Sequence, residues 1–600
     1  MGSEMTKTTD AAPTTPDPIE IAMEAEATGE APRGVAHRVL AKQEQLIGWE
    51  IADRRAAFAL KLLTAFAGLA VVAVLGAMAW RASEAGGLVV EAFVVPPQFA
   101  EDGLTGEVLA RDVLDRLAQF DRETNSVFVT KVTDSWSNST KIELAQTGLS
   151  LDDLDRLLRR WLGDETYVRG ELVRTPTGVR LTGRTTAGAP ATIEGPATEL
   201  RALTQQLAER IYRNAKPNGY AEWLIRQQRY EEAGPVLQQV LAVADDPHSR
   251  TLAYDLLGIV SQNSGDARGA VAYYDAATRS PDPTLAALAA ANAAWAEGLL
   301  GHSEAQRQQQ ERSYAIARKG WRHIGELQRN SLKVARLASE FDYLAAERQA
   351  RPDVDRLIPG TRIGAGRREH AGLLANLHQL SAARRLKEPT PFTPPLPALW
   401  ANDAWPDMLT AHALVPLPIQ RQPAMRAYQV IALTKLGRLD EAGALVATLP
   451  PDCDVCHGAK GILLAAEGDV PGSERAFAEA LRLAPNSVTL LIARGRERLA
   501  RGDAPSAAAD FRRANKLAPA FADPLAYWGE ALLAQSDAQG ASVQFADAAS
   551  RAPRWGRLHL KWGEALAKLG KADEARAKWR AAATMDLSPA DRAALKAHGV

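Results

Sequence analysis

Cysteine is nearly absent from this sequence. Only Cys453 and Cys456 occur among 600 residues, and aromatic residues make up just 6%. Two cysteines cannot form the set of several disulfides that stabilises small secreted domains, which excludes a disulfide-dense fold. Alanine, by contrast, is abundant and favours helices that pack closely.

An excess of charge of either sign is also lacking. The 71 lysines and arginines nearly balance the 72 aspartates and glutamates, so the formal net charge is −1. A surface that binds nucleic acid needs an excess of basic residues to neutralise phosphates. The composition therefore predicts no nucleic-acid partner.

Catalytic signatures are missing as well. The sequence contains no HExxH, no GxSxG and no P-loop motif. Its ten histidines are scattered. His370 and His378 lie eight residues apart in a helical stretch, and we interpret them as surface or hydrogen-bonded histidines rather than ligands. We therefore expect no enzyme, no metal site and no cofactor.

One long hydrophobic run stands out near the N-terminus. Residues 57–80 read AFALKLLTAFAGLAVVAVLGAMAW, 24 residues with a single charge, Lys61. About 20 apolar residues cross a bilayer as a helix. A signal peptide is the rival interpretation, but more than 50 residues precede the run and no small-residue cleavage site ends it. A buried core helix is the other alternative, and such long apolar runs are rare in soluble helices.

The charges that flank this run predict its orientation. Six basic residues lie on its N-terminal side or just inside it: Arg33, Arg38, Lys42, Arg54, Arg55 and Lys61. On the other side Arg81 stands alone until Arg111. Positive charge stays in the cytoplasm. We therefore expect residues 1–56 to be a cytoplasmic tail, disordered and then a juxtamembrane helix. The bulk of the chain is then periplasmic, anchored in a bacterial inner membrane.

Residues 82–215 mix strand and helix patterns. A strand is predicted at 88–95, and residues 166–174 and 178–186 read as a hairpin joined by the turn Thr175–Gly178. Helical spacing of apolar residues marks 105–120, 151–161 and 197–213. The pattern indicates a small α/β or α+β periplasmic domain.

Four sets of residues recur at a spacing of 34 in the C-terminal part. They are Gly461, Gly495, Gly529 and Gly563; Phe477, Phe511, Phe545 and Trp579; Ala480, Ala514, Ala548 and Ala582; and Pro485, Pro519 and Pro553. One period shared by four sets indicates an array of repeats.

This pattern resembles the tetratricopeptide repeat (TPR) family, in which each repeat is a pair of helices, A and B. The resemblance implies that the glycine lets helix A approach helix B and that the aromatic ring packs between them. It also implies that the alanine lies at their closest contact and that the proline ends helix B. Lys460 and Arg494 depart from the family pattern, which has leucine there, and Leu587 replaces the last proline.

The register extends unevenly toward the N-terminus. Residues 219–305 look like further TPR repeats, whereas 306–420 keep helical spacing, lose the register and include a proline-rich stretch at 389–400. Residues 421–600 hold the well-formed repeats. The sequence thus predicts a mainly α fold, a TPR helical solenoid preceded by one transmembrane helix and the small α/β (α+β) domain.

The TPR resemblance also implies a binding groove lined by the A helices. The two rows of groove positions hold Gly458, Ile492, Ala526 and Leu560, and Ile462, Arg496, Glu530 and Glu564. These residues do not form the lysine and asparagine clamp that grips a C-terminal carboxylate in some members. We expect an apolar floor with mixed charges that binds a helix or an extended segment. The alternative is that residues 306–420 fill the groove.

The stretch Cys453–His457 has the CxxCH spacing of a c-type haem attachment site. It falls at the start of a well-formed repeat, where there is little room for haem and no nearby methionine or second histidine. Two cysteines three residues apart at a helix start can reach the geometry of a disulfide. We expect a disulfide between Cys453 and Cys456, with free or metal-bound thiols, or a haem on Cys453, Cys456 and His457, as alternatives.

Three functions remain open from the sequence. The first is a membrane-anchored periplasmic scaffold that binds a protein or peptide partner through its repeats. The second is an electron-transfer protein with one c-type haem. The third is an envelope signalling or stress sensor whose repeats report to the cytoplasmic tail.

Overall fold

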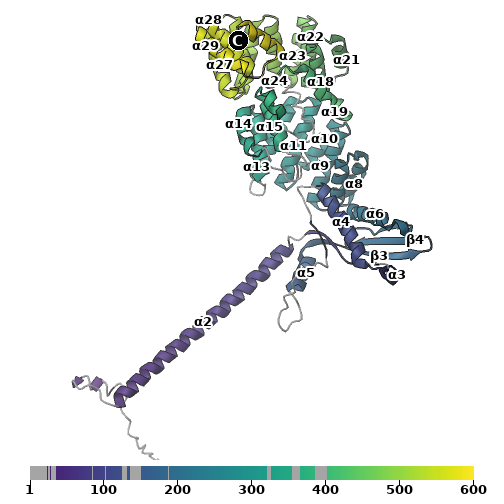
Figure 1. Ribbon diagram of the computed structural model, residues 1–600, viewed down its shortest axis with the longest axis vertical. Coiled ribbons are helices and arrows are strands. Elements are labelled where there is room, and N and C mark those ends of the chain that lie inside the picture. The colour runs from purple at the N-terminus through teal and green to yellow at the C-terminus, as the bar shows by residue number, and fades with distance from the viewer. Residues whose placement is uncertain are drawn as a thin grey trace, which may run out of the picture. The chain divides into compact units, whose positions relative to one another are not determined.

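The computed structural model describes most of the chain (Figure 1). The described residues are 20, 23–24, 27–28, 35–83, 86–101, 103–124, 131–134, 151–186, 188–320, 326–353, 365–385 and 402–600. They form two compact units, residues 1–87 with 137–165, and residues 88–136 with 166–600. The proline-rich stretch at 389–400 and nearly all of the tail predicted to be disordered lie outside the described residues.

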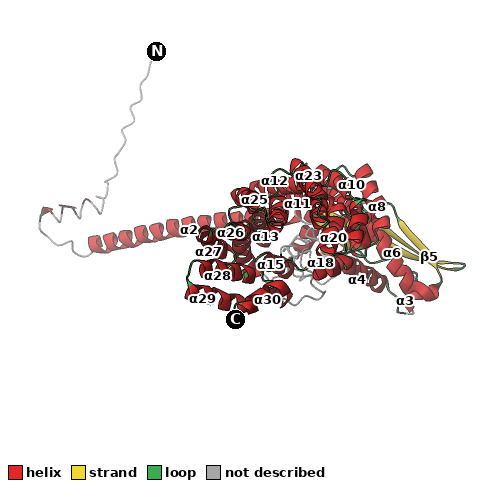
Figure 2. Ribbon diagram, turned by 90° about the horizontal axis from the view of Figure 1, so that it is seen from above, coloured by secondary structure: helices red, strands yellow, loops and turns green. Residues whose placement is uncertain are grey.

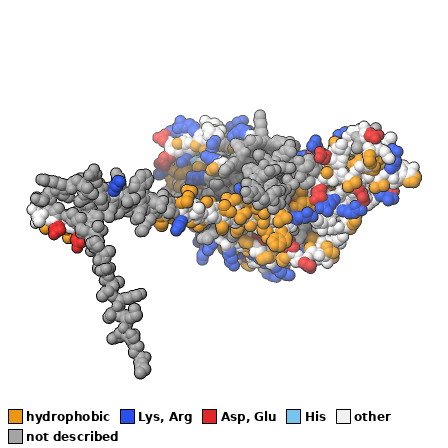
Figure 3. Space-filling view, turned by 90° about the horizontal axis from the view of Figure 1, so that it is seen from below, with side chains coloured by type: hydrophobic (Ala, Val, Ile, Leu, Met, Phe, Trp, Pro, Cys, Tyr) orange, Lys and Arg blue, Asp and Glu red, His pale blue; other side chains and the backbone are white. Residues whose placement is uncertain are grey.

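The first unit is built on one long helix, α2 (Val35–Ser83), which runs without a break from the juxtamembrane segment through the hydrophobic run. Residues Phe58–Ser83 are long and apolar enough to cross a membrane, a test that a signal sequence also passes. Many of the exposed large hydrophobic side chains belong to this segment. Figure 3 shows hydrophobic side chains gathered on the face seen from below. The second helix of this unit, α5 (Leu151–Leu162), packs beside α2.

The second unit begins with a five-stranded sheet of order β2-β1-β3-β4-β5. Its strands are β1 (Gly86–Val90), β2 (Lys131–Asp134), β3 (Asp164–Thr175), β4 (Gly178–Thr185) and β5 (Ala191–Gly195). The predicted hairpin is confirmed as the antiparallel pair β3–β4, and β4 pairs with β5 in the same sense. The strand predicted at 88–95 is shorter, because regular pairing stops after Val90 and only Val94 bridges to Glu171.

One face of this sheet packs against helices, as Figure 1 shows for β4 and α6 and Figure 2 for β5 and α6. The helices of this part are α3 (Pro97–Glu101), α4 (Gly106–Thr124), the short η1 (Ala197–Glu199) and α6 (Leu200–Ala215). Along β4, Val179, Leu181 and Gly183 are buried while Arg180 and Arg184 are exposed, and Thr182 is the one buried residue on the outer side. This alternation is what a sheet covered on one face requires.

The sheet domain shares its core with the first helices of the solenoid. The ring of Phe120 on α4 stacks on Tyr212 of α6 and meets Trp223 edge-on, with centroids 5.1 and 5.0 Å away. The polar ends of the Tyr212 and Trp223 side chains are hydrogen-bonded, since Tyr212 donates to Asp121 at 2.8 Å and Trp223 donates to Glu123 at 2.8 Å. The domain therefore covers the end of the first repeat, as terminal caps of solenoids do.

Two arrays of helix pairs follow. The first comprises α7 (Pro217–Arg226), α8 (Tyr230–Val243), α9 (Pro247–Asn263), α10 (Ala267–Ala277), α11 (Pro283–Leu300), α12 (Ser303–Lys319), α13 (Glu326–Ser339), α14 (Tyr343–Ala350), the short η2 (Arg351–Asp353), α15 (Ala365–Asn376) and α16 (Leu380–Arg385). Helix pairing thus persists, among the described residues, well into the region 306–420 that the sequence pattern left without a register.

The second array comprises α18 (Trp405–Ala413), α19 (Leu417–Gln420), α20 (Pro423–Lys435), α21 (Leu439–Val446), α22 (Asp454–Ala466), α23 (Val470–Leu483), α24 (Val488–Ala500), α25 (Ala504–Leu517), α26 (Ala522–Ala534), α27 (Ala538–Arg551), α28 (Gly556–Lys568), α29 (Ala572–Ala583) and α30 (Pro589–Ala597). The mainly α solenoid predicted from the 34-residue period is confirmed.

The glycine and the aromatic ring of each repeat meet as expected. A Cβ atom added at Gly495 would lie 2.5 Å from the Phe511 ring, and one at Gly563 would lie 2.3 Å from Trp579. Such distances leave no room for any side chain larger than hydrogen. Ala514 and Ala582, at the closest helix contacts, are fully buried. Close approach of the two helices thus explains why the glycine recurs.

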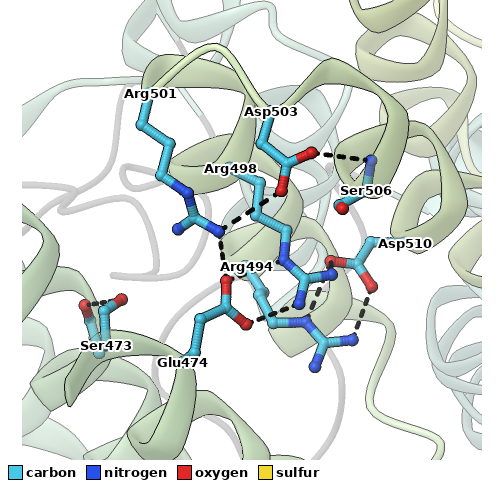
Figure 4. A network of polar contacts seen from close by, with 9 residues as sticks. Ser473, Glu474, Arg494, Arg498, Arg501, Asp503, Ser506 and Asp510 are labelled. Carbon is cyan, nitrogen blue, oxygen red and sulfur yellow. Dashed lines mark hydrogen bonds and ion pairs between the residues drawn. The ribbon is translucent and has the colours of Figure 1, made fainter. Parts of the chain in front are cut away.

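A charged network accounts for the departure at Arg494 (Figure 4). In place of the usual leucine, Arg494 forms two hydrogen bonds to Asp510, at 2.6 and 3.0 Å. Arg498 forms ion pairs with both Asp510, at 2.9 Å, and Glu474, at 2.6 Å. Arg501 also pairs with Glu474. The network ties α23, α24 and α25 together at a place where most repeats use an apolar contact.

This network predicts an acid-sensitive contribution to stability. Hydrogen bonds from Arg498, and then from Arg501, lower the pKa of Glu474 from 4.5 to about 2, although partial burial opposes the shift. A carboxylate with a lowered pKa stabilises the folded state above its ordinary pKa, and this contribution disappears as pH falls through the folded pKa. Glu474→Gln should therefore lower the melting temperature above pH 4.5 and match the unmodified protein near pH 2.

Glu479 provides the matched control, because it pairs with Arg482 on one exposed helix turn. Glu479→Gln should change the melting temperature little at any pH, since exposed pairs contribute little. Equal effects of the two substitutions at neutral pH, or a Glu474→Gln effect that persists near pH 2, would contradict the role assigned to the network.

Candidate functional site

The two arrays dock on one another through their turns. In the first array, the turn between α11 and α12 meets the start of α22. Asp454 donates its backbone N–H to the Gly301 carbonyl at 3.0 Å. Its carboxylate accepts from the backbone N–H and the hydroxyl of Ser303, both at 2.6 Å. Burial raises the pKa of Asp454, and the hydrogen bonds from Ser303 act against that shift.

Two further turns of the first array lie against later helix starts of the second. After α13, the Phe341 ring stacks on Phe521 with centroids 5.0 Å apart. After α15, His378 Nε2 lies 2.9 Å from Asp523 and its ring stacks on Trp555 at 3.6 Å. His378 is therefore a hydrogen-bonded histidine, as interpreted from the sequence. His370 lies 3.3 Å from Glu347, and its Nδ1 has no partner among the described residues.

A cavity of about 400 Å³ lies between the docked arrays. The second array contributes the A helices α20, α22 and α24, through residues such as Tyr428, Ile462 and Ala493. The first array contributes α11 to α14, including Arg307 and Tyr343. Most of the lining is apolar, so the cavity combines a hydrophobic interior with a few polar groups, as ligand sites usually do.

Two tyrosines supply hydrogen-bonding groups inside this cavity. Tyr343 and Tyr428 both line it, and neither hydroxyl has a partner among the described residues. Burial raises the pKa of both, and the proximity of Tyr428 raises that of Tyr343 further. Both hydroxyls therefore stay neutral and are available to donate to an acceptor on a bound molecule.

The predicted groove residues are placed in three different ways. Gly458 and Ile462 line the cavity. Ile492 and Leu560 are buried in the cores between helices, with 3% and 0% of their surfaces exposed. The charged members are paired within the chain: Arg496 with Asp403 at 2.5 Å, Glu530 with Arg557 at 2.8 Å and Glu564 with Lys561 at 3.0 Å.

Residues from the region 306–420 therefore lie against the second array. Asp403 reaches Arg496, whose guanidinium also covers the Tyr527 ring at 5.0 Å. Although burial alone would disfavour the charge, Asp403 and Tyr527 raise the pKa of Arg496 above its ordinary value. The described part of this region thus occupies one predicted groove position, that of Arg496.

Tyr428 was not identified as a site residue from the sequence, although the 34-residue period indicates it. It lies 34 residues before Ile462 and so occupies the same groove position one repeat earlier. No period indicates Tyr343, because the first array has lost the register there.

Cys453 and Cys456 lie at the start of α22, next to the docking contact. Their sulfur atoms are joined in a disulfide, with Cα atoms 5.2 Å apart, and both residues are buried. Cys453 caps the helix, because its sulfur accepts from the backbone N–H of Cys456 at 3.1 Å. Gly301 packs so closely that a Cβ there would lie 2.4 Å from the Cys453 sulfur.

This packing does not fit a covalent haem. Both cysteines are at most 2% exposed, so a porphyrin bonded to them would have to displace the surrounding helices. The ring of His457, the axial ligand in that alternative, is hydrogen-bonded to the Pro451 carbonyl at 2.9 Å. Among the described residues, no group of three or more potential metal ligands lies close together.

No family model and no curated protein sequence matches this chain. The solved structure of Pseudomonas aeruginosa PilF matches 29% of this chain and 87% of its own, at 14% identity and a TM-score of 0.26. Yeast Tom70 matches 63% of this chain and 95% of its own, at 13% identity and a TM-score of 0.28. The structure of MamA AMB-1 matches 27% of this chain and 98% of its own, at 18% identity and a TM-score of 0.23. Likeness this low carries no argument about this chain.

The docking contact at Arg496 yields a testable prediction. Asp403→Asn removes the charge that pairs with Arg496 and keeps the shape of the side chain. Asparagine also tolerates the positive φ of 53° at this residue. We expect a loss of about 1–3 kcal/mol in local stability, because a part-buried cation loses the carboxylate that balances its charge. Hydrogen exchange of α24 and α26 measures this loss without requiring the whole array to unfold in one step.

Asp407→Asn is the matched control. Asp407 pairs with Arg384 at the same 2.5 Å, but both side chains are about half exposed, at 51% and 50%. Its loss should cost less than about 1 kcal/mol. Faster exchange of α24 and α26 in Asp407→Asn than in Asp403→Asn would show that the Asp403 contact does not stabilise these two helices.

Proposed function

We propose that this protein is a membrane-anchored scaffold that binds a protein or peptide partner in the cavity between its two TPR arrays. The observation that carries this proposal is the cavity itself, in which the hydroxyls of Tyr343 and Tyr428, without a partner among the described residues, stand in a mostly apolar lining. The groove positions farther along the second array are already paired or buried within the chain. Partner recognition is therefore concentrated at the cavity, and we assign the protein no catalytic role.

The cavity size favours an extended segment over a helix. A volume of about 400 Å³ accommodates one or two large side chains but not the width of a helix with its side chains. Apolar residues such as Val455 and Ile462 would bury the anchoring side chain, and the tyrosine hydroxyls would donate to main-chain carbonyls of the bound segment. Asn486 and Thr489 at the same site offer further hydrogen bonds.

We further propose that α2 spans the inner membrane of a bacterium, with the N-terminus in the cytoplasm and the repeats in the periplasm. The apolar segment Phe58–Ser83 and the excess of arginine and lysine before it support this orientation. In that compartment thiols are oxidised, which accords with a structural disulfide at Cys453 and Cys456.

The location of the binding site can be tested by photo-crosslinking in cells. A benzoylphenylalanine placed at Tyr428 of the full chain should give a discrete adduct with a partner, because this side chain lines the cavity. The same group at Val543, a half-exposed residue on helix α27, should give no such adduct. Asn486→Trp, which places a bulky ring at the cavity, should suppress the adduct at 428. Identical adducts at both positions, or one insensitive to Asn486→Trp, would contradict this site.

Compartment and disulfide can be tested together. Cells are quenched with acid and an alkylating reagent before lysis. The protein should then carry no alkyl group, and its intact mass should be lower than that of the reduced chain by two hydrogen atoms. Reduction should restore these two hydrogen atoms. Cytosolic protein would keep both thiols. A reporter active only in the periplasm, fused after Val600, serves as the independent control. A silent reporter would refute the orientation, whereas an active reporter with alkylated cysteines would refute only the disulfide.

A further inference from the structure

Helix α5 has two chemically different faces. Its apolar residues follow one another at steps of three and four, which places them on one side of a helix. They are Leu151, Leu154, Leu157, Leu158, Trp161 and Leu162. Arg159 and Arg160 fall on the other side, and Arg159 pairs there with Asp155 at 2.6 Å. The sequence pattern alone would be explained by a core on which the apolar face packs.

The structure leaves much of that apolar face uncovered. Trp161 is 84% exposed, Leu157 is 64% exposed and Leu162 is 43% exposed. Leu154 and Leu158, on the same side of the helix, are only half-buried. A tryptophan and two leucines gathered on one exposed face are unfavourable in water and mark a surface that is covered by something else.

The position of α5 within its own unit indicates what covers it. It packs beside α2, the helix that carries the candidate membrane span (Figure 1). Every side chain of α2 from residue 59 to 77 is exposed, and burial begins only at Met78, Ala79 and Ala82. Protein therefore covers α2 only at the C-terminal end of the span, where a membrane helix leaves the bilayer.

Trp80 marks the same level on α2. It is 68% exposed and lies in the last turn of the span, beside the basic residue Arg81. Tryptophan concentrates at the boundary between acyl chains and head groups, because its ring is apolar and its N–H is polar. Trp80 and Trp161 thus belong to two helices of one unit and share the chemistry of an interfacial belt.

We propose that α5 lies flat in the outer interface of the bilayer, with Leu157 and Trp161 inserted among the acyl chains and the arginine side facing water and head groups. This proposal rests on the proposed membrane span of α2. It assigns the segment 151–162 a second attachment to the same membrane, separate from the span itself.

The charge of α5 specifies which lipid property matters. Its three aspartates (Asp152, Asp153 and Asp155) balance its three arginines (Arg156, Arg159 and Arg160), so the helix carries no net charge. Attraction to anionic head groups is therefore small, and burial of apolar side chains supplies the binding. A zwitterionic bilayer should suffice, and salt should not displace the helix.

Site-directed fluorescence on the full chain in phosphatidylcholine nanodiscs tests this placement. A single cysteine at Trp161→Cys carries an environment-sensitive label without reductant, since the two native cysteines are buried and joined. Its emission should shift to shorter wavelength and be quenched by lipids with a spin label on the acyl chain. Leu157→Cys should behave the same way, and high salt should leave both signals unchanged.

Three control positions make the outcomes distinct. Val243→Cys, on an exposed side chain of α8, should give a water-like, unquenched signal, and Arg160→Cys should be quenched less than Trp161→Cys. Leu69→Cys, in the middle of the span, should be quenched strongly. A quenched label at 69 with a water-like label at 157 and 161 would overturn the interfacial helix but leave the span intact. A water-like label at 69 would overturn both, and loss of quenching in salt would overturn the apolar mode of binding.

Discussion

The docking of the first helical array on the second is the constraint on which the rest of the structure depends. Asp454 and Asp523 are buried carboxylates at helix starts of the second array, and each is hydrogen-bonded to a turn of the first, at Ser303 and at His378. A buried carboxylate without a partner is costly, so these contacts fix the relative position of the arrays. The cavity exists because the arrays meet in this one arrangement.

Self-contact changes how the repeats can recognise a partner. In an open solenoid, the A helices present a continuous groove, whereas here Asp403 pairs with Arg496 and the Phe341 ring lies on Phe521. Among the described residues, a cavity built from both arrays stays accessible, with Tyr343 from one and Tyr428 from the other. A bound segment would contact two parts of the chain that are far apart in sequence, so recognition depends on their docking as well as on the repeats themselves.

The sequence predicted the features that recur with the 34-residue period and those that follow one helix, but few of the contacts between distant segments. The recurrence of glycine and phenylalanine, as at Gly495 and Phe511, followed from local packing and was correct. Tyr428 was within reach of the same period. The contact of Ser303 with Asp454 could not be predicted in this way, because 151 residues separate the two and neither position belongs to the repeat pattern. The spacing of apolar residues likewise shows that α5 has an apolar side, but only the structure shows that much of this side is exposed.

One helix start connects the cysteine pair, the docking contact and the cavity. Cys453 caps α22, the next residue holds the turn at Ser303, and Val455, one residue later, already lines the cavity. Gly301 has a left-handed φ of 77° and leaves no space beside the Cys453 sulfur, so the first turn of α22 cannot shift without moving the docked turn. The disulfide that fixes this turn therefore also fixes one wall of the cavity. The cysteine pair and the shape of the cavity are linked through four consecutive residues, 453–456.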